Sequence, residues 1–213
     1  MKDIAIFGAG GFGREVACLI RLINEVELTW NLVGFFDDGC EAGSRNEYGA
    51  VLGGMDALNM YDKALNIVVA VGNPMAISSI VGKITNPNIS YPNLFAPSVL
   101  FLDKDNVSFG KGNIVCSNSL FSCNVCVGDF NIFNGYVPVG HDAKIGNFNV
   151  FMPAVKVSGS TTIGDWNFFG VQSVILQGVR VENKVRLGAG SVMMRTAKEG
   201  NLYMGNPATK VKL

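Results

Sequence analysis

The sequence predicts an α/β domain of parallel strands and helices, followed by a parallel β-helix. Three observations support this fold class. The chain opens with a strand, a glycine turn and a helix; an apolar residue occupies every sixth position through the second half; and glycines and asparagines return there every 18 residues. The first pattern is typical of α/β folds, and the two periods are typical of stacked coils of short strands.

The start of the chain predicts a phosphate-binding turn. The segment IAIFGAGGFGREVACLI predicts a strand from Ile4 to Phe7, a turn, and a helix from about Phe12. Its G-x-G-x-x-G pattern is formed by Gly8, Gly10 and Gly13. Such glycines let the backbone approach a phosphate, and the helix N-terminus offers amide donors and the positive end of a dipole. A tight turn without a ligand is the alternative.

Two further strands are expected in the first domain. The segment NLVGFFDD predicts a strand that ends at Asp37 and Asp38. An acid at this place can accept a hydrogen bond from a ribose hydroxyl, and a solvated turn acid is the alternative. The segment LNIVVAVGN predicts a third strand that ends at Gly72 and Asn73.

Helical stretches near residues 55–63 and 74–84 complete a single Rossmann-like βαβαβα unit over residues 1–85. A full dinucleotide fold needs two such halves. One half suits a mononucleotide moiety, such as a sugar nucleotide, better than a whole NAD, so an NAD-dependent oxidoreductase is disfavoured. A connector marked by three prolines follows over residues 86–106.

The second half predicts the β-helix over residues 107–198, with a tail over residues 199–213. Every sixth residue from Phe109 to Met193 is apolar. The glycines spaced by 18 are Gly110, Gly128, Gly146 and Gly164, and the asparagines with the same spacing are Asn113, Asn131, Asn149 and Asn167. Eighteen residues make one coil with three short sides. We expect apolar residues inside, the asparagines in a ladder, and the glycines at corners with positive φ.

Composition limits the function classes. Lys+Arg and Asp+Glu both number 17, so the basic surplus typical of nucleic-acid binders is missing. No apolar run is long enough for a membrane span. The five cysteines form no disulfide framework, which favours reduced thiols in the cytoplasm. Cys123 and Cys126 form one C-x-x-C, but zinc needs a second ligand pair, so no metal site is expected.

The two halves together resemble one family. The resemblance covers nearly the whole chain and rests on the ordered segments FGAGGFGREV, VGFFDD, YGAVLGGMDAL, VAVGN, VGHDAKIG, VSGSTTIG, GAGSV and YMGNPATK. These segments resemble the hexapeptide-repeat sugar-nucleotide N-acetyltransferases of bacteria and the related sialic-acid O-acetyltransferases. The resemblance implies a left-handed β-helix and transfer of an acetyl group from acetyl-CoA to a sugar amine. It also implies a homotrimer with CoA between adjacent prisms, and a role in surface polysaccharide biosynthesis.

The same resemblance implies which residues form the site. His141, the only histidine in the chain, matches the catalytic base, and Asp142 follows it. The positions that match those holding the sugar nucleotide are Gly10, Gly11, Phe12, Asp37, Asp38 and Gly72. The positions that match those beside acetyl-CoA are Val150, Gly159 and Gly170. Relatives can have histidine where Phe12 and Val150 stand, so Phe12 puts substrate identity in question and Val150 removes a possible hydrogen bond to the donor.

His141 also fits the role of base on chemical grounds. It comes two places after the inward residue Val139, which predicts an outward corner and not the core. An imidazole with an unperturbed pKa of about 6.5 suits proton removal from an amine near neutrality. Asp142 can fix the tautomer and stabilise the imidazolium. We expect direct attack on the thioester, with a backbone amide near Gly159 polarising the carbonyl. A surface histidine without function is the alternative.

Two rival functions stay open at this point, and a third is excluded. A zinc hydratase on a similar β-helix needs three histidines, which this chain lacks. A sugar O-acetyltransferase, acting for instance on sialic acid, would use the same base on a hydroxyl. A non-catalytic sugar-nucleotide-binding protein would show no turnover of acetyl-CoA.

Overall fold

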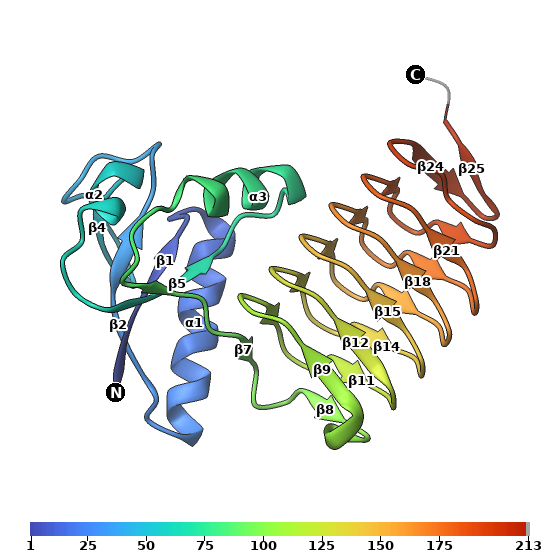
Figure 1. Cartoon of the computed structure of the whole chain (residues 1–213), viewed down its shortest axis with the longest axis horizontal. Coiled ribbons are helices and arrows are strands. Elements are labelled where there is room, and N and C mark those ends of the chain that lie inside the picture. Colours follow the sequence, from blue (N-terminus) through green and yellow to red (C-terminus); the bar gives the residue numbers. More distant parts are fainter. Residues whose placement is uncertain (212–213) are drawn as a thin grey trace. The chain divides into compact units, whose positions relative to one another are not determined.

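The computed structural model describes residues 1–211. The chain divides into two compact units, Met1–Pro97 and a second unit from Ser98 onward, and Figure 1 shows the elements of each. Among the described residues, no helix combines the length and the apolar character needed to cross a membrane.

The first unit is an α/β fold around one largely parallel sheet. The sheet order is β3-β4-β2-β1-β5-β6, and only β3 and β4 pair antiparallel. Its strands are β1 (Lys2–Phe7), β2 (Trp30–Phe36), β3 (Arg45–Asn46), β4 (Gly49–Gly53), β5 (Leu65–Val69) and β6 (Ile89–Ser90). Its helices are α1 (Gly11–Val26), α2 (Met55–Asn59) and α3 (Pro74–Lys83), and the short strand β7 (Leu94–Phe95) follows. The predicted Rossmann-like unit is confirmed.

Burial explains why these segments form this sheet. The central strands are apolar on both faces, as expected for a parallel sheet covered by helices. Their fully buried side chains include Ile4, Ile6, Phe35, Phe36, Ile67 and Val68. The helix α1 is amphipathic and buries Val16, Leu19 and Ile20. The strand β4 was not among the three that the sequence predicts, because GAVLG is short and bounded by glycines.

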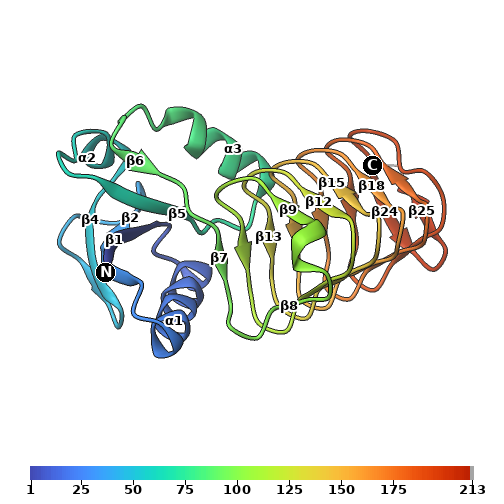
Figure 2. The same ribbon diagram turned by 60° about the horizontal axis from the view of Figure 1, so that its bottom comes forward.

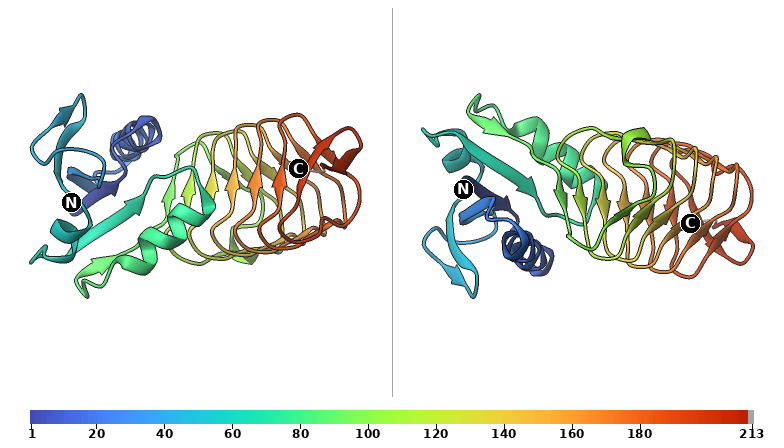
Figure 3. Two further views of the ribbon diagram at one scale, coloured as in Figure 1. Left: turned by 90° about the horizontal axis from the view of Figure 1, so that it is seen from above. Right: turned by 90° about the horizontal axis from the view of Figure 1, so that it is seen from below.

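The second unit is the predicted β-helix, built from short parallel strands on three sides. Face A consists of β8 (Leu100–Phe101), β11 (Leu120–Phe121), β14 (Pro138–Val139), β17 (Lys156–Val157), β20 (Val174–Ile175) and β23 (Val192–Met193). Face B consists of β9 (Val107–Phe109), β12 (Val125–Val127), β15 (Lys144–Ile145), β18 (Thr162–Ile163) and β21 (Arg180–Val181). Face C contains β10 (Ile114–Val115), β13 (Ile132–Phe133), β16 (Val150–Phe151), β19 (Phe168–Phe169), β22 (Arg186–Leu187), β24 (Leu202–Gly205) and the antiparallel β25 (Ala208–Lys210). The coils lie in register in Figure 2 and in both views of Figure 3.

The six-residue apolar period marks the inner residue of each strand, as predicted. All positions of this series from Val115 to Met193 are buried, and Phe109 at its start is half-buried. The rings of Phe133, Phe151 and Phe169 stack with centroids 4.7 Å apart, because equivalent residues of successive coils lie above one another. The strand β8 precedes the first strand that the period indicates. A 3₁₀ turn at Lys104–Asn106 separates β8 from β9, so Phe101 pairs with Phe121 and breaks the count of 18.

The asparagine ladder is confirmed. Asn113, Asn131, Asn149 and Asn167 are all 0% exposed. The Nδ2 of Asn149 donates to Asn131 Oδ1 at 3.0 Å and to the Gly164 carbonyl at 2.9 Å, while Asn167 donates to Asn149 in the same way. The backbone amide of Val185, where the sequence pattern ends, donates to Asn167 Oδ1 at 2.7 Å. Each buried amide group therefore finds partners in the neighbouring coils.

The expectation that the glycines spaced by 18 adopt positive φ is wrong. The left-handed conformation instead falls on a different residue of each hexad, every sixth position from Gly112 to Gly190, where most residues have side chains. The glycines spaced by 18 allow the backbones of successive coils to approach closely. A Cβ on Gly128 would lie 2.7 Å from the Gly146 carbonyl oxygen, and one on Gly146 would lie 2.8 Å from that of Gly164. Close approach of backbone, and not φ, accounts for this spacing.

We predict that Asn149→Ala destabilises the β-helix by roughly 2–4 kcal/mol, because the Asn167 amide and the Gly164 carbonyl lose a partner while buried. The measurement is the free energy of unfolding in urea, with circular dichroism as the probe. The control is Asn106→Ala, which removes an exposed bond to Asp103. This change should cost no more than about 0.5 kcal/mol. Equal costs for the two variants would contradict a structural role for the ladder.

Candidate functional site

The glycine turn of the first unit leaves the start of α1 open. Gly8 has φ +111°, and a Cβ there would lie 2.7 Å from the Ala70 carbonyl oxygen. Gly13 packs against the Gly8 carbonyl, where a Cβ would collide. Gly10 is the N-cap of α1 and supplies no side-chain cap, and a Cβ on Gly10 or Gly11 would meet only open space. The first amides of the helix are therefore available to an anion.

The two acids after β2 hold backbone amides. Asp37 accepts from the Ala9 amide at 2.8 Å through Oδ2 and from the Gly39 amide at 2.8 Å through Oδ1. It therefore ties the glycine turn to the end of β2. Asp38 accepts from the Met55 amide at 2.6 Å at the start of α2. Both acids line a pocket of about 450 Å³ whose other lining residues are Cys40, Gly54, Met55, Asp56 and Lys83.

Gly72 lies just after β5, beside the N-cap of α3. Asn73 caps that helix, accepting from the amides of Met75 and Ala76. Because β5, β1 and β2 are parallel neighbours, their carboxyl ends share one edge of the sheet. The structure thus brings Gly10, Gly11, Phe12, Asp37, Asp38 and Gly72 to that edge, which is the usual binding edge of an open α/β sheet.

His141 lies in the second unit, on the corner between face A and face B, as the sequence predicts. The side chain is 49% exposed, and its Nδ1 lies 2.7 Å from Oδ2 of Asp142. Asp142 has φ +59°, the left-handed conformation that closes each corner, and this turns its carboxylate back toward the imidazole. An acid next in sequence can reach the ring only because of this corner geometry.

The neighbouring coils complete the corner. Asn124, one coil earlier, donates from Nδ2 to Asp142 Oδ1 at 3.2 Å. The hydrogen bonds from His141 and Asn124 hold the pKa of the Asp142 carboxyl below its ordinary value. Gly159, one coil later, lies under the imidazole: a Cβ there would be 2.6 Å from His141 Nε2 and 2.7 Å from Cε1. Sequence analysis missed Asn124, although its spacing of 18 from Asp142 was a usable signal.

Val150 and Gly170 lie elsewhere on the β-helix. Val150 is the first residue of β16 on face C, and Gly170 follows β19 at the corner between face C and face A. Face A runs from that corner to the corner of His141, so the two corners are the opposite edges of one face. Within one chain, the structure therefore brings only Gly159 of the three predicted acetyl-CoA positions to His141.

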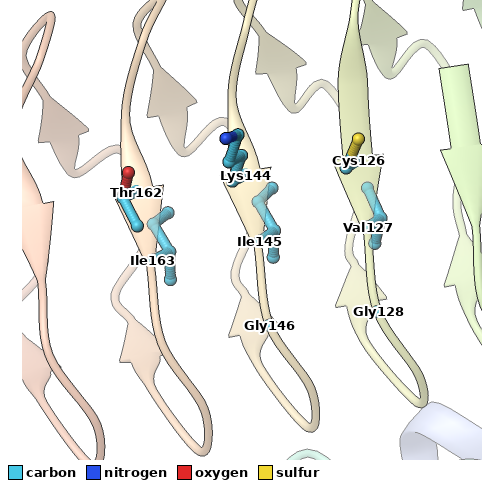
Figure 4. Close-up of a pocket in the computed structure, with 8 residues that line it drawn as sticks. All are labelled: Cys126, Val127, Gly128, Lys144, Ile145, Gly146, Thr162 and Ile163. Carbon is cyan, nitrogen blue, oxygen red and sulfur yellow. The ribbon is translucent and has the colours of Figure 1, made fainter. Parts of the chain in front are cut away.

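The outer surface of face B carries a shallow pocket of about 400 Å³ beside this corner. Figure 4 shows that Cys126, Lys144 and Thr162 project from β12, β15 and β18 in one row. This row includes the ammonium group of Lys144, which lies three residues after His141 in the sequence. No group of three or more metal-ligating side chains gathers within residues 1–211.

Comparisons with known proteins agree with this architecture. The family model for the PglD N-terminal domain matches residues 3–84. Comparison with curated proteins finds no match to this chain. The acetyltransferase domain of PglB from Neisseria gonorrhoeae FA1090, solved with acetyl coenzyme A, is 28% identical, with a TM-score of 0.88 over 99% of each chain.

Two further solved structures share the fold. WeeI from Acinetobacter baumannii AYE is 25% identical, with a TM-score of 0.88, over 99% of this chain and 100% of the other. A mutant of perosamine N-acetyltransferase from Caulobacter crescentus, in complex with CoA and GDP-perosamine, is 23% identical. Its TM-score is 0.87, over 100% of this chain and 98% of the other. At that identity the last comparison supports the fold alone.

An N-terminal Rossmann-like domain followed by a β-helix is the fold that this chain shares with solved hexapeptide-repeat acyltransferases. More narrowly, the first unit matches the model of the PglD N-terminal domain, and the whole chain is similar in sequence and fold to the acetyltransferase domain of PglB.

We predict that Gly159→Ala lowers kcat of acetyl transfer by about 10²-fold while the protein stays folded. The new methyl group would displace the imidazole, and small misplacements of a reacting group carry costs of this size. Steady-state kinetics and thermal melting test this. Gly82→Ala, in α3 with open space around it, is the control. Normal turnover by Gly159→Ala would contradict the position of the ring.

Proposed function

We propose that this chain transfers the acetyl group of acetyl-CoA to the amine of a nucleotide-linked amino sugar, with His141 as general base. The observation that carries this proposal is the His141–Asp142 pair on an exposed β-helix corner, with its ring over Gly159. Similarity to the acetyltransferase domain of PglB, which was solved with acetyl coenzyme A, supports the reaction class. The open glycine turn of the first unit supports a nucleotide-linked acceptor.

The proton path follows from the tautomer. An ionised Asp142 accepts a hydrogen bond from the Nδ1–H of His141, which keeps the proton on Nδ1 and leaves the lone pair of Nε2 free to act as base. The amine nitrogen attacks the thioester carbonyl, and Nε2 takes the proton that the nitrogen loses. The tetrahedral intermediate then collapses, the C–S bond breaks, and the imidazolium returns the proton to the CoA sulfur. His141 ends neutral, as it began, without an acyl-enzyme.

Gly159 has two parts in this proposal. Its missing side chain makes room for the imidazole, and its amide is the proposed donor to the carbonyl oxygen of the thioester. A backbone donor of this kind would offset the absence of a polar side chain at Val150, the position where relatives can have histidine.

The first unit is proposed to bind the sugar nucleotide through backbone groups. Gly10, Gly11 and Phe12 would supply amides to the diphosphate at the start of α1. Asp37 already accepts two backbone amides, so we assign it mainly to holding the turn. Asp38 and Gly72 remain proposed contacts to the nucleoside, and Asp38 lines the neighbouring pocket.

The distribution of charge suits this division of ligands. Ten of the 17 acidic residues but only six of the 17 basic residues lie in residues 1–97, so the second unit is positive overall. A positive β-helix favours the phosphates of CoA. We propose a cytoplasmic location, because acetyl-CoA is a cytoplasmic metabolite and no disulfide forms among the described cysteines.

We propose a homotrimer that completes the site. The outward residues of face A are Leu100, Leu120, Pro138, Lys156, Val174 and Val192, and five of these six are apolar. The outward residues of face B are Ser108, Cys126, Lys144, Thr162 and Arg180. If three prisms turn face A toward a threefold axis, the His141 edge of one copy meets the Gly170 edge of the next. This arrangement would supply the wall that an exposed corner lacks.

We predict that His141→Ala lowers kcat by roughly 10²–10⁴-fold in a folded protein, because general-base assistance is lost. Release of the CoA thiol is measured with a panel of UDP-, dTDP- and GDP-linked amino sugars, and with sialic acid. The control is Gln177→Ala, at the same corner position two coils further on. Near-normal turnover by His141→Ala would refute the base. Turnover by the wild type with hydroxyl acceptors alone would favour an O-acetyltransferase. An absence of turnover with every acceptor would favour a non-catalytic binding protein.

We predict that Val174→Lys, on face A, dissociates the trimer and lowers kcat/KM for acetyl-CoA at least tenfold. The new ammonium group would lie beside Lys156 of the preceding coil in an apolar contact, where an unpaired charge is costly. Light scattering measures the mass against the 22.8 kDa monomer. Ser108→Lys, at an exposed outward position of face B that does not line the pocket beside His141, should leave mass and activity unchanged. A fully active wild-type monomer would contradict the shared site.

A further inference from the structure

The corner of His141 contains a polar side chain that the proposed reaction does not use. Asn124 occupies the left-handed position of its corner, with φ +56°, and Asp142 occupies the same position one coil later, with φ +59°. The amide of Asn124 donates to Asp142 Oδ1 at 3.2 Å, and Asp142 Oδ2 lies 2.7 Å from His141 Nδ1. The two oxygens of one carboxylate are thus held from opposite sides.

We infer that Asn124 is a positioning residue, which fixes the Asp142 carboxylate so that His141 keeps its proton on Nδ1 and its lone pair on Nε2. This inference rests on the proposed role of His141 as base. Asn124 contacts the carboxylate and not the imidazole, so it acts through Asp142.

The requirement for an amide follows from the exposure of the corner. The side chains of His141 and Asp142 are 49% and 52% exposed, so water competes for both carboxylate oxygens. A carboxylate held at one oxygen can rotate about its Cβ–Cγ bond, since this torsion is broad. A second hydrogen bond at the other oxygen removes that freedom. Asparagine tolerates the left-handed backbone and also supplies an N–H donor, whereas aspartate would place a second negative charge against Asp142.

The opposite side of the imidazole is fixed by contact. Gly159 lies against Nε2, Cε1 and Cδ2 of the ring, so the face of the ring rests on backbone. Three successive coils therefore define the base: Asn124 orients the acid, Asp142 orients the ring, and Gly159 makes room for it. Asn124 and Asp142 occupy the same corner position in successive coils, 18 residues apart. His141 and Gly159 occupy the position just before it, also 18 residues apart.

The test uses the fact that the chain has a single histidine. Protein labelled with ¹⁵N-histidine gives one pair of ring nitrogens, and their couplings to the ring protons identify the tautomer. Well above the ordinary imidazole pKa of about 6.5, the wild type should be the Nδ1–H form. Asn124→Ala should show a substantial share of the Nε2–H form. The pKa of Asp142, followed by ¹³C NMR, should rise toward its ordinary value, because a hydrogen bond that lowers it is gone.

The matched control is Asn118→Ala. Asn118 has the same left-handed conformation, with φ +60°, and lies on a different corner, so this variant carries the same backbone cost without touching Asp142. It should keep the wild-type tautomer. Asn124→Gly removes the amide while easing the backbone, so it should behave like Asn124→Ala and exclude strain as the cause. An Nδ1–H form undisturbed in both Asn124 variants would overturn the inference.

Kinetics provide a second readout. Asn124→Ala should lower kcat about three- to tenfold with little change in KM for either substrate, and should have no further effect in an Asp142→Ala background. An equal fall in both backgrounds would contradict action through Asp142. The NMR result does not require turnover, so a protein with the expected tautomer shift but no acetyl transfer would refute the proposed function and leave the positioning role intact.

Discussion

The stacking of coils in a fixed 18-residue register is the constraint on which the rest of the β-helix depends. Backbone amides of each coil donate to carbonyls of the next, for instance Ser122 to Val139 and Gly140 to Val157. Through the central coils, each residue is therefore placed over its counterpart 18 positions away. A polar side chain buried in such a stack finds its hydrogen-bond partner in the equivalent residue of the neighbouring coil, as the asparagines do. Where the backbones of two coils approach closely, as at Gly146, there is no room for a side chain.

The same register builds the candidate site from three coils. No segment of the sequence contains Asn124, Asp142 and Gly159 together, yet they lie at one corner because their spacing matches the coil. The left-handed turn that closes the corner aims both the amide and the carboxylate. A structural requirement of the fold, a tight turn in each hexad, thus sets the geometry of the proposed base. This explains how an exposed, two-residue corner can hold an oriented imidazole without a surrounding pocket.

The sequence predicted the features in which a residue type repeats. It missed those in which only a backbone conformation repeats. Apolar and asparagine periods gave the inner residues and the ladder. The left-handed positions carry residues as different as Phe148, Ala154 and Gln172, so no composition signal marks them, and glycine was assigned there wrongly. The outward corner of His141 followed from its distance to Val139. Asn124 did not follow, because its partner is an aspartate and a search for identical residues at a spacing of 18 passes over unlike pairs.

The two units would attract phosphates in different ways. The first unit is acidic overall, and its candidate diphosphate site is a helix N-terminus whose amides are left open by Gly10 and tied in place by Asp37. Oriented amides attract a phosphate at short range whatever the net charge of the domain. The second unit has no helix at its candidate site, and its excess of Lys and Arg is spread along the coils. Its proposed attraction for an anionic donor would therefore come from side-chain charge, which acts over about a Debye length and weakens in salt. The zero net charge of the chain is the sum of a negative first unit and a positive second unit.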